Sequence, residues 1–142
     1  MPGKFNESGI HFQYPENWKL EREQNDDGFT ITLQSPGTAF FMFCLREDSP
    51  APAEMADTAL EALREDYPQL EADDRTETFA GQMALGHDIQ FFSLDLVNTC
   101  WTRCFMSPQG TVLVLCQTSD IESAGNEPVL RAICASMKVD ED

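Results

Sequence analysis

The feature that most constrains the fold of this chain is an alternation of apolar and polar residues with period two, which recurs in several short segments. It is cleanest from Phe29 to Gln34, where apolar and polar residues alternate strictly and Thr30, Ile31 and Thr32 are β-branched. That pattern indicates a strand with one buried face. The segments 10–14, 18–22, 83–94, 99–107 and 111–118 also read as strands, and the polar segment 70–79 reads as a weak edge strand.

Two other segments change to the helical period. From Pro52 to Tyr67 apolar residues recur at three and four residues, and Pro68 ends the pattern. A second helix is predicted from about residue 127 to Met137, opened by Asn126 and Pro128. With turns such as 107–110 joining strands directly, and no repeat or linker, we expect one α+β domain over residues 1–142 with a mainly antiparallel sheet.

Size and charge limit what the domain can bind. A chain of 142 residues that is 42% hydrophobic can remove about two-thirds of its extended surface from water. Its formal net charge of −16 repels phosphates, so we expect neither nucleic acid nor anionic membrane as a partner. The expected partner is another protein with a basic or amphipathic surface, and the alternative is that the acidic residues serve only solubility.

The cellular compartment is predicted from the apolar segments and the cysteines of the sequence. The chain has no apolar run of about 18 residues, and its first residues lack the apolar stretch of a signal peptide. Its five cysteines are an odd number and lie inside strand and helix patterns, which favours reduced thiols over a disulfide framework. We therefore expect a cytoplasmic protein.

Three short motifs in this element order resemble a known superfamily. The segment 9–18, GIHFQYPENW, resembles the opening G-[IV]-x-[FL]-x-[YLF]-P-x-x-W of the Mog1/PsbP-like superfamily. Gly81 with Ala84 is similar to the central G-x-x-A motif of that superfamily, and the segment 133–139, ICASMKV, is similar to its closing I-x-x-S-[FIM]-x-[VI]. The resemblance implies an α-β-α sandwich around an antiparallel sheet.

The resemblance also implies a range of roles. Eukaryotic Mog1 proteins bind the small GTPase Ran, and PsbP proteins support photosystem II. Bacterial relatives include lipoproteins and cytoplasmic chaperones for type VI secretion effectors. Protein binding is what these roles share, so the function implied by analogy is a non-catalytic protein-binding domain, a chaperone or an adaptor, without a cofactor.

Two features are candidates for binding. In the all-apolar strand 40–45, Phe41 and Phe43 share one face and Met42 lies on the other. If a helix covers only one side, the remainder is an open apolar groove; the alternative is coverage on both faces. The second candidate is the strand face with Trp101 and Arg103, residue types common in interfaces. Its alternative is a Trp packed under the second helix, with Arg103 reaching Asp88 or another carboxylate.

A cysteine-dependent enzyme is the alternative from another functional class. A two-residue turn at Leu96–Val97 would place Ile89 opposite Cys104 and leave His87 as the diagonal neighbour of Cys104. Against this, no third orienting group is evident, and the apolar neighbours of Cys104 would raise the pKa of its thiol. We therefore expect no catalytic residues.

No metal site is expected either. Cys100 and Cys104 lie about 13 Å apart along an extended strand, too far for one disulfide or one zinc ion. Cys116 is expected on the opposite face of the sheet. A third alternative for the function is a structural subunit that forms a homodimer through its sheet edge or its Phe-rich face.

Overall fold

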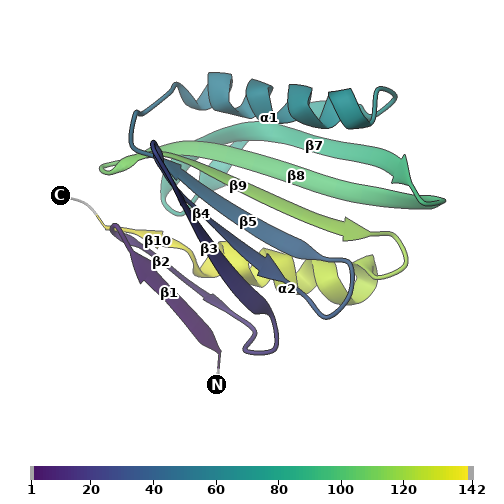
Figure 1. Cartoon of the computed structure of the whole chain (residues 1–142), viewed down its shortest axis with the longest axis horizontal. Helices are drawn as coiled ribbons and strands as arrows, with labels where there is room; N and C mark the ends of the chain where they lie inside the picture. Colours follow the sequence, from purple (N-terminus) through teal and green to yellow (C-terminus); the bar gives the residue numbers. More distant parts are fainter. Residues whose placement is uncertain (1, 141–142) are drawn as a thin grey trace.

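The computed structural model describes residues 2–140, and its main feature is a seven-stranded sheet in which every neighbouring pair is antiparallel (Figure 1). In sequence order the strands are β3 (Lys19–Asn25), β4 (Gly28–Gln34), β5 (Phe40–Arg46), β6 (Glu71–Phe79), β7 (Gln82–Ser93), β8 (Leu96–Ser107) and β9 (Gly110–Ser119). Their order across the sheet is β3-β4-β5-β9-β8-β7-β6. The mainly antiparallel sheet predicted from period-two alternation is confirmed, and the polar strand β6 lies at an edge.

A second sheet of three strands was not predicted. It contains β1 (Gly3–Glu7), β2 (Ile10–Tyr14) and β10 (Lys138–Val139), in the order β1-β2-β10. In β1 only Phe5 is buried, and β10 has two residues, so neither strand carries a readable alternation. Phe5 lies opposite Phe12 of β2, and their stacked rings, 4.7 Å apart, turn toward the large sheet's core.

Two helices complete a three-layer arrangement. Helix α1 (Pro52–Asp66) covers one face of the large sheet, whereas α2 (Ser123–Ser136) and the small sheet lie against the other face (Figure 1). The predicted α-β-α sandwich is therefore confirmed. Proline in the first turn starts α1, and the backbone leaves the helix at Tyr67, before Pro68. Within residues 2–140, neither helix has the length and hydrophobicity needed to cross a membrane.

Helix α2 begins about one turn earlier than predicted, so that Pro128 lies inside it. The reason is a tertiary contact rather than a local signal. The Glu122 carboxylate accepts hydrogen bonds from the backbone N–H of Thr38 (2.8 Å) and from its hydroxyl (2.9 Å). It also accepts one from the side-chain amide of Asn126 (2.9 Å). These contacts anchor the first turn to the loop before β5, which the local sequence does not reveal.

Strand β5 is covered on both of its faces. Phe41 and Phe43 are fully buried among the rings of the small sheet, while Phe40, Met42 and Cys44 pack toward α1. The open groove predicted over Phe41, Met42 and Phe43 is therefore absent, and the alternative of complete coverage holds. Phe41 and Phe43 are also inaccessible as a contact surface for a homodimer, and self-association itself stays a prediction.

The β7–β8 hairpin turns two residues earlier than predicted, at Leu94–Asp95 instead of Leu96–Val97. Both turn residues have positive φ (54° and 63°), as a type I′ turn requires. Ile89 consequently lies opposite Cys100. Farther along, a Cβ on Gly86 would come within 1.9 Å of the Thr102 carbonyl oxygen, so only glycine permits this close approach of β7 to β8.

Candidate binding groove between α2 and β6

One face of the large sheet is only partly covered. Helix α2 packs on β9 and β2, so β6, β7 and β8 extend beyond it on the same face. Two adjoining cavities of about 650 and 360 Å³ lie between the helix and these strands, and Trp101 and Arg131 line both. We call this feature the α2–β6 groove. It is bounded by Glu71 and Glu77 of β6, Trp101 of β8, and Arg131 and Cys134 of α2.

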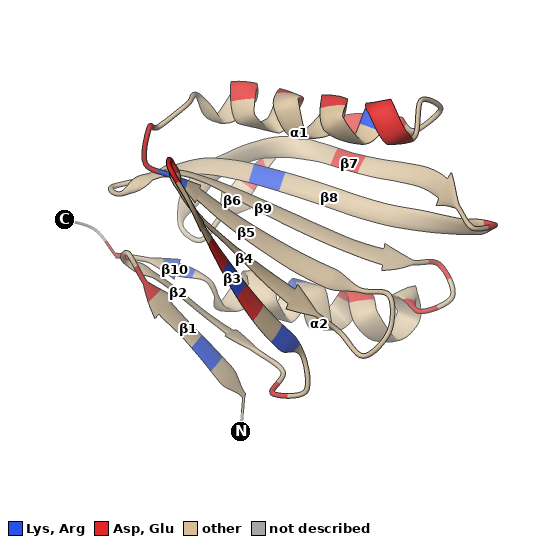
Figure 2. Ribbon diagram, viewed as in Figure 1, with Lys and Arg blue, Asp and Glu red and all other residues tan. Residues whose placement is uncertain are grey.

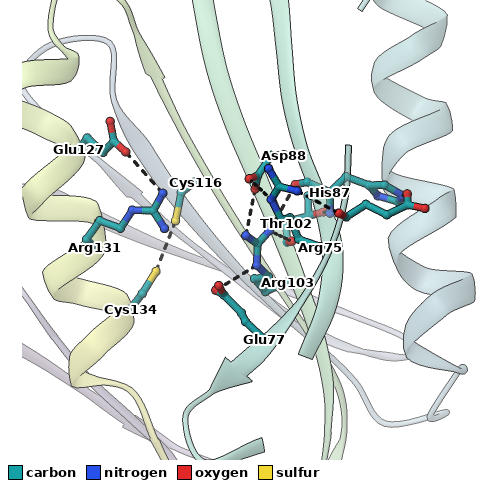
Figure 3. Close-up of polar contacts among 11 residues, drawn as sticks. Arg75, Glu77, His87, Asp88, Thr102, Arg103, Cys116, Glu127, Arg131 and Cys134 are labelled. Carbon is teal, nitrogen blue, oxygen red and sulfur yellow. Dashed lines mark hydrogen bonds and ion pairs between the residues drawn. The ribbon is translucent and has the colours of Figure 1, made fainter. Parts of the chain in front are cut away.

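Trp101 and Arg131 form the centre of the groove. The indole of Trp101 is only 2% exposed, and the Arg131 guanidinium lies 4.3 Å from its ring centroid, a cation–π geometry. Glu127, one helical turn before Arg131, accepts a 3.4 Å hydrogen bond from the same guanidinium (Figure 3). The guanidinium covers the buried indole, so the pair presents a half-exposed cation above an aromatic ring.

Beneath the groove, Arg103 is 2% exposed and fully paired. Its guanidinium donates to Glu77 of β6 at 3.1 Å, to Asp88 of β7 at 2.9 Å and to the Thr102 carbonyl at 2.7 Å (Figure 3). Asp88 accepts a second bond from Arg75 at 2.8 Å. This alternation of two cations and two anions links three strands, and we call it the Arg103 network. Because a buried charge is stable only when paired, the network holds the floor rigid.

The sequence predictions for this face are confirmed in their geometry. Trp101 lies opposite Cys116, and Arg103 lies opposite Val114, as the predicted β8–β9 hairpin requires. Trp101 packs beneath α2 and Arg103 reaches Asp88, which was the packing alternative. Their role in binding stays a prediction.

The predicted Cys104–His87 site has no reactive nucleophile. Cys104 is fully buried, and burial raises the pKa of its thiol to about 12, so it is protonated at neutral pH. His87 faces α1, with Nε2 at 3.2 Å from Asp74 and 3.8 Å from Asp57. The cysteine-dependent enzyme therefore finds no support in this arrangement.

The thiols on the other face were not singled out from the sequence. Cys116 of β9 and Cys134 of α2 bring their sulfurs within 3.6 Å, and Arg131 lies beside them (Figure 3). Cys134 stands at a variable position of the closing motif and Arg131 lies outside the motifs, and only the docking of α2 on the sheet creates their proximity to β9. Across residues 2–140, no group of three His, Cys, Asp or Glu side chains is placed to hold a metal ion.

Comparison with known proteins finds solved structures with a similar fold and no match at the level of sequence families. No family model matches the sequence, and no curated protein matches it. Among solved structures, PsbP (CyanoP) of the cyanobacterium Synechocystis sp. PCC 6803 superimposes with a TM-score of 0.65 at 12% identity, covering 98% of this chain and 92% of that one. LpqN of Mycobacterium tuberculosis, which is involved in cell envelope biogenesis, superimposes with a TM-score of 0.57 at 18% identity. The match covers 98% of this chain and 89% of LpqN.

A third similar structure is PA94 of Pseudomonas aeruginosa, a protein of unknown function described as a candidate regulator. It gives a TM-score of 0.52 at 13% identity, covering 92% of this chain and 91% of its own. None of the three descriptions names a catalysed reaction. The chain is thus an α+β sandwich protein, and its fold is Mog1/PsbP-like.

Proposed function

We propose that this chain is a non-catalytic protein-binding domain that holds a basic, extended segment of another protein along β6 and in the α2–β6 groove. The observation that carries the proposal is the position of the groove. It opens on the sheet face directly beside the edge strand β6, whose residues line both cavities. A segment that pairs with β6 would therefore also direct every second side chain into the groove.

The free edge supplies main-chain hydrogen bonding. β6 has nine residues and pairs with β7 on one side, and within residues 2–140 no strand pairs with its other side. The outward N–H and C=O groups of such an edge are available to an added strand. Specificity would then come from the side chains that enter the groove.

Charge determines which segment fits. β6 carries four carboxylates against one guanidinium: Glu71, Asp73, Asp74, Glu77 and Arg75. The opposite edge strand, β3, balances its charges: Lys19, Arg22, Glu21 and Glu23. A basic segment is therefore attracted to β6 rather than to β3. A second copy of this chain would be repelled there, which disfavours a homodimer through this edge.

The groove also supplies apolar contact. Phe79, Trp101 and Met137 form the nearly buried bottom of the larger cavity, and Ala80 and Val139 are partly exposed above them. Aromatic and Arg side chains contribute most of the affinity in many interfaces. An amphipathic segment with apolar residues toward Trp101 and basic residues toward β6 would satisfy both parts of the surface.

A chaperone or adaptor would use such a groove to hold a segment of its client before assembly. The resemblance to cytoplasmic effector chaperones supports this form of the proposal, by analogy of fold. A reducing cytoplasm would suit a chain whose five cysteines are all free thiols.

The test uses a fluorescent decapeptide of alternating Lys and Val, with an alternating Glu and Val decapeptide for comparison, and measures binding by fluorescence anisotropy. We expect the basic peptide to bind and the acidic one not to. The double variant E71K/D73K, on the groove side of β6, should weaken binding by about tenfold or more.

The matched control is E21K/E23K on β3, which changes the net charge by the same amount at the other edge. It should change affinity by less than about threefold. Equal losses in both variants would mean that binding follows total charge and not β6. Absence of binding to the folded wild-type protein would also overturn the proposal.

A further inference from the structure

Two cysteine thiols meet where α2 packs on the sheet. Cys116 on β9 is fully buried, Cys134 on α2 is partly exposed, and their sulfurs are 3.6 Å apart (Figure 3). Cys134 is one of the residues that line the larger cavity of the α2–β6 groove, which makes this cavity the approach route to its side chain. The remaining thiols, Cys44, Cys100 and Cys104, pack on the α1 side of the sheet.

The surroundings make the two sulfurs unequal. A hydrogen bond from the Cys116 thiol lowers the pKa of Cys134, and the guanidiniums of Arg131 and Arg103 lower it further, with burial acting in the opposite direction. Burial raises the pKa of Cys116 well above its usual value. A partly exposed thiol with a lowered pKa beside a buried thiol with a raised pKa is the arrangement of a redox-reactive cysteine and its resolving partner.

We propose that Cys134 is a hydroperoxide-reactive site and that Cys116 resolves it to an intramolecular disulfide. The Cys134 thiolate attacks one peroxide oxygen. An S–O bond forms, the O–O bond breaks, and the leaving hydroxide or alkoxide takes up a proton. The Cys116 sulfur then attacks Cys134 and displaces water from the sulfenic acid, with the Cys116 proton leaving in that water. In total, two thiols and one hydroperoxide give a disulfide, one alcohol or water, and one further water.

The geometry permits the second step with little movement. The sulfurs must close from 3.6 Å to about 2.05 Å, a distance that side-chain rotation and a small shift of α2 can supply. The disulfide would tie α2 to β9 across the sandwich, and it would remove the thiolate beside Arg131 and Trp101. Reduction by a thiol would restore the open pair. This site does not depend on the proposed binding function.

The test is made on the full-length protein, reduced and then treated with one equivalent of hydrogen peroxide. Free thiols are blocked after denaturation, and tryptic peptides are analysed by mass spectrometry. We expect the intact protein to lose two hydrogens and a disulfide to join peptides 104–131 and 132–138. Cys134 should react at least about tenfold faster than Cys100 and Cys104, whose thiols are buried. Equal rates at these cysteines would overturn the proposal.

Variants separate the two roles. In C116S the reaction with peroxide should end at a sulfenic acid on Cys134, which dimedone traps. If the serine disturbs the core, C116A serves the same purpose. C134S should not form the disulfide. C104S is the matched control, because peptide 104–131 also contains Cys104, and it should behave as the wild-type protein does. Loss of two hydrogens at the wild-type rate in folded C134S, or disappearance of the disulfide between the two peptides in folded C104S, would contradict the assignment.

Discussion

Arg103 shows how strongly a single residue can determine the floor of the α2–β6 groove. Its guanidinium is 2% exposed and holds both Glu77 and Asp88. Replacing it with Met (Arg103→Met) would leave these two carboxylates without their buried cation. Because both carboxylates are more than a third exposed, water can solvate them, and we expect a loss of about 1.5–3 kcal/mol in the free energy of unfolding, measured by urea denaturation.

The control for this substitution is Arg64→Met on α1. Arg64 makes an ion pair with Glu61 at 3.5 Å on the outer surface, and such exposed pairs contribute about 0–1 kcal/mol. Similar losses of unfolding free energy from both substitutions would show that the Arg103 network stabilises the fold no more than an exposed ion pair does. The comparison also tests whether this floor is a rigid platform.

For single residues, the sequence pattern predicted the sheet face on which a side chain lies better than it predicted the side chains that it contacts. Alternation along 99–107 correctly put Trp101 and Arg103 on one face and Cys100 and Cys104 on the other. It could not predict that Arg131 stacks on Trp101 or that Cys134 meets Cys116, because both contacts depend on how α2 docks. Phe41 and Phe43 were misassigned to an open groove because β1 helps to cover them, and the sequence of β1 shows no alternation that would predict a strand.

At the scale of elements, Glu122 fixes where α2 begins. Hydrogen bonds from the Thr38 backbone and hydroxyl, and then from Asn126, lower the pKa of the Glu122 carboxyl from its usual 4.5. Its contribution to stability is therefore present above the unfolded-state pKa and is lost as pH falls through the lowered folded-state pKa. We expect the NMR shift of the Thr38 amide to change in that acidic range.

The variant E122Q tests this contact directly, because its side chain cannot ionise. Its Thr38 amide should show no such titration, and the first turn of α2 should exchange its amide hydrogens faster than in the wild-type protein at neutral pH. An unchanged titration of Thr38 in E122Q would mean that another group is responsible.

The β7–β8 turn offers a stabilising substitution. Leu94 is 92% exposed and, with Asp95, adopts positive φ, which Asn and Gly tolerate much better. The double variant L94N/D95G should gain about 0.5–1 kcal/mol in unfolding free energy, visible as a higher urea midpoint.

The same change at the β8–β9 turn, P108N/Q109G, is the matched control. These two residues do not have positive φ, so the substitution only increases the freedom of the unfolded polypeptide and should lower stability. A stabilising effect at both turns would argue that the backbone at Leu94–Asp95 is not the cause.

Local signals explain which elements the sequence could predict. The strands of the large sheet and α1 were predicted to within a few residues, most of them from periodicity and β6 as a polar edge strand. The hairpin turn at Leu94–Asp95 was misplaced because neither residue is a usual type I′ turn residue. β10 was missed because two residues carry no period, and α2 was started late because Glu122 acts through tertiary partners.

At the scale of the whole molecule, negative charge is present on nearly every exposed element. Figure 2 shows acidic residues along α1 with few basic residues between them, whereas acidic and basic residues alternate on β3. The 25 acidic residues outnumber the nine Lys and Arg residues, so the ion pairs at Arg22, Arg46 and Arg131 neutralise only a part of the surface. Repulsion among the remaining carboxylates opposes the compact state.

Salt should therefore stabilise this protein. Raising NaCl from about 10 mM to about 300 mM shortens the screening length, which weakens long-range repulsion more than it weakens the short ion pairs. We expect the free energy of unfolding to rise by about 1 kcal/mol, measured by urea denaturation at neutral pH. Sucrose at matched osmolality is the uncharged control, and it should stabilise the wild-type protein and a charge-reduced variant equally.

The variant E65Q/D66N supplies that comparison, because both residues are exposed at the C-terminal end of α1. Carboxylates there are unfavourable to the helix dipole as well as to the net charge. The variant should be more stable than the wild-type protein at low salt and should gain less from added NaCl. If salt instead lowered the stability of the wild-type protein, the few ion pairs would outweigh the excess of carboxylates, and attraction of basic segments to β6 would have to arise from local charge alone.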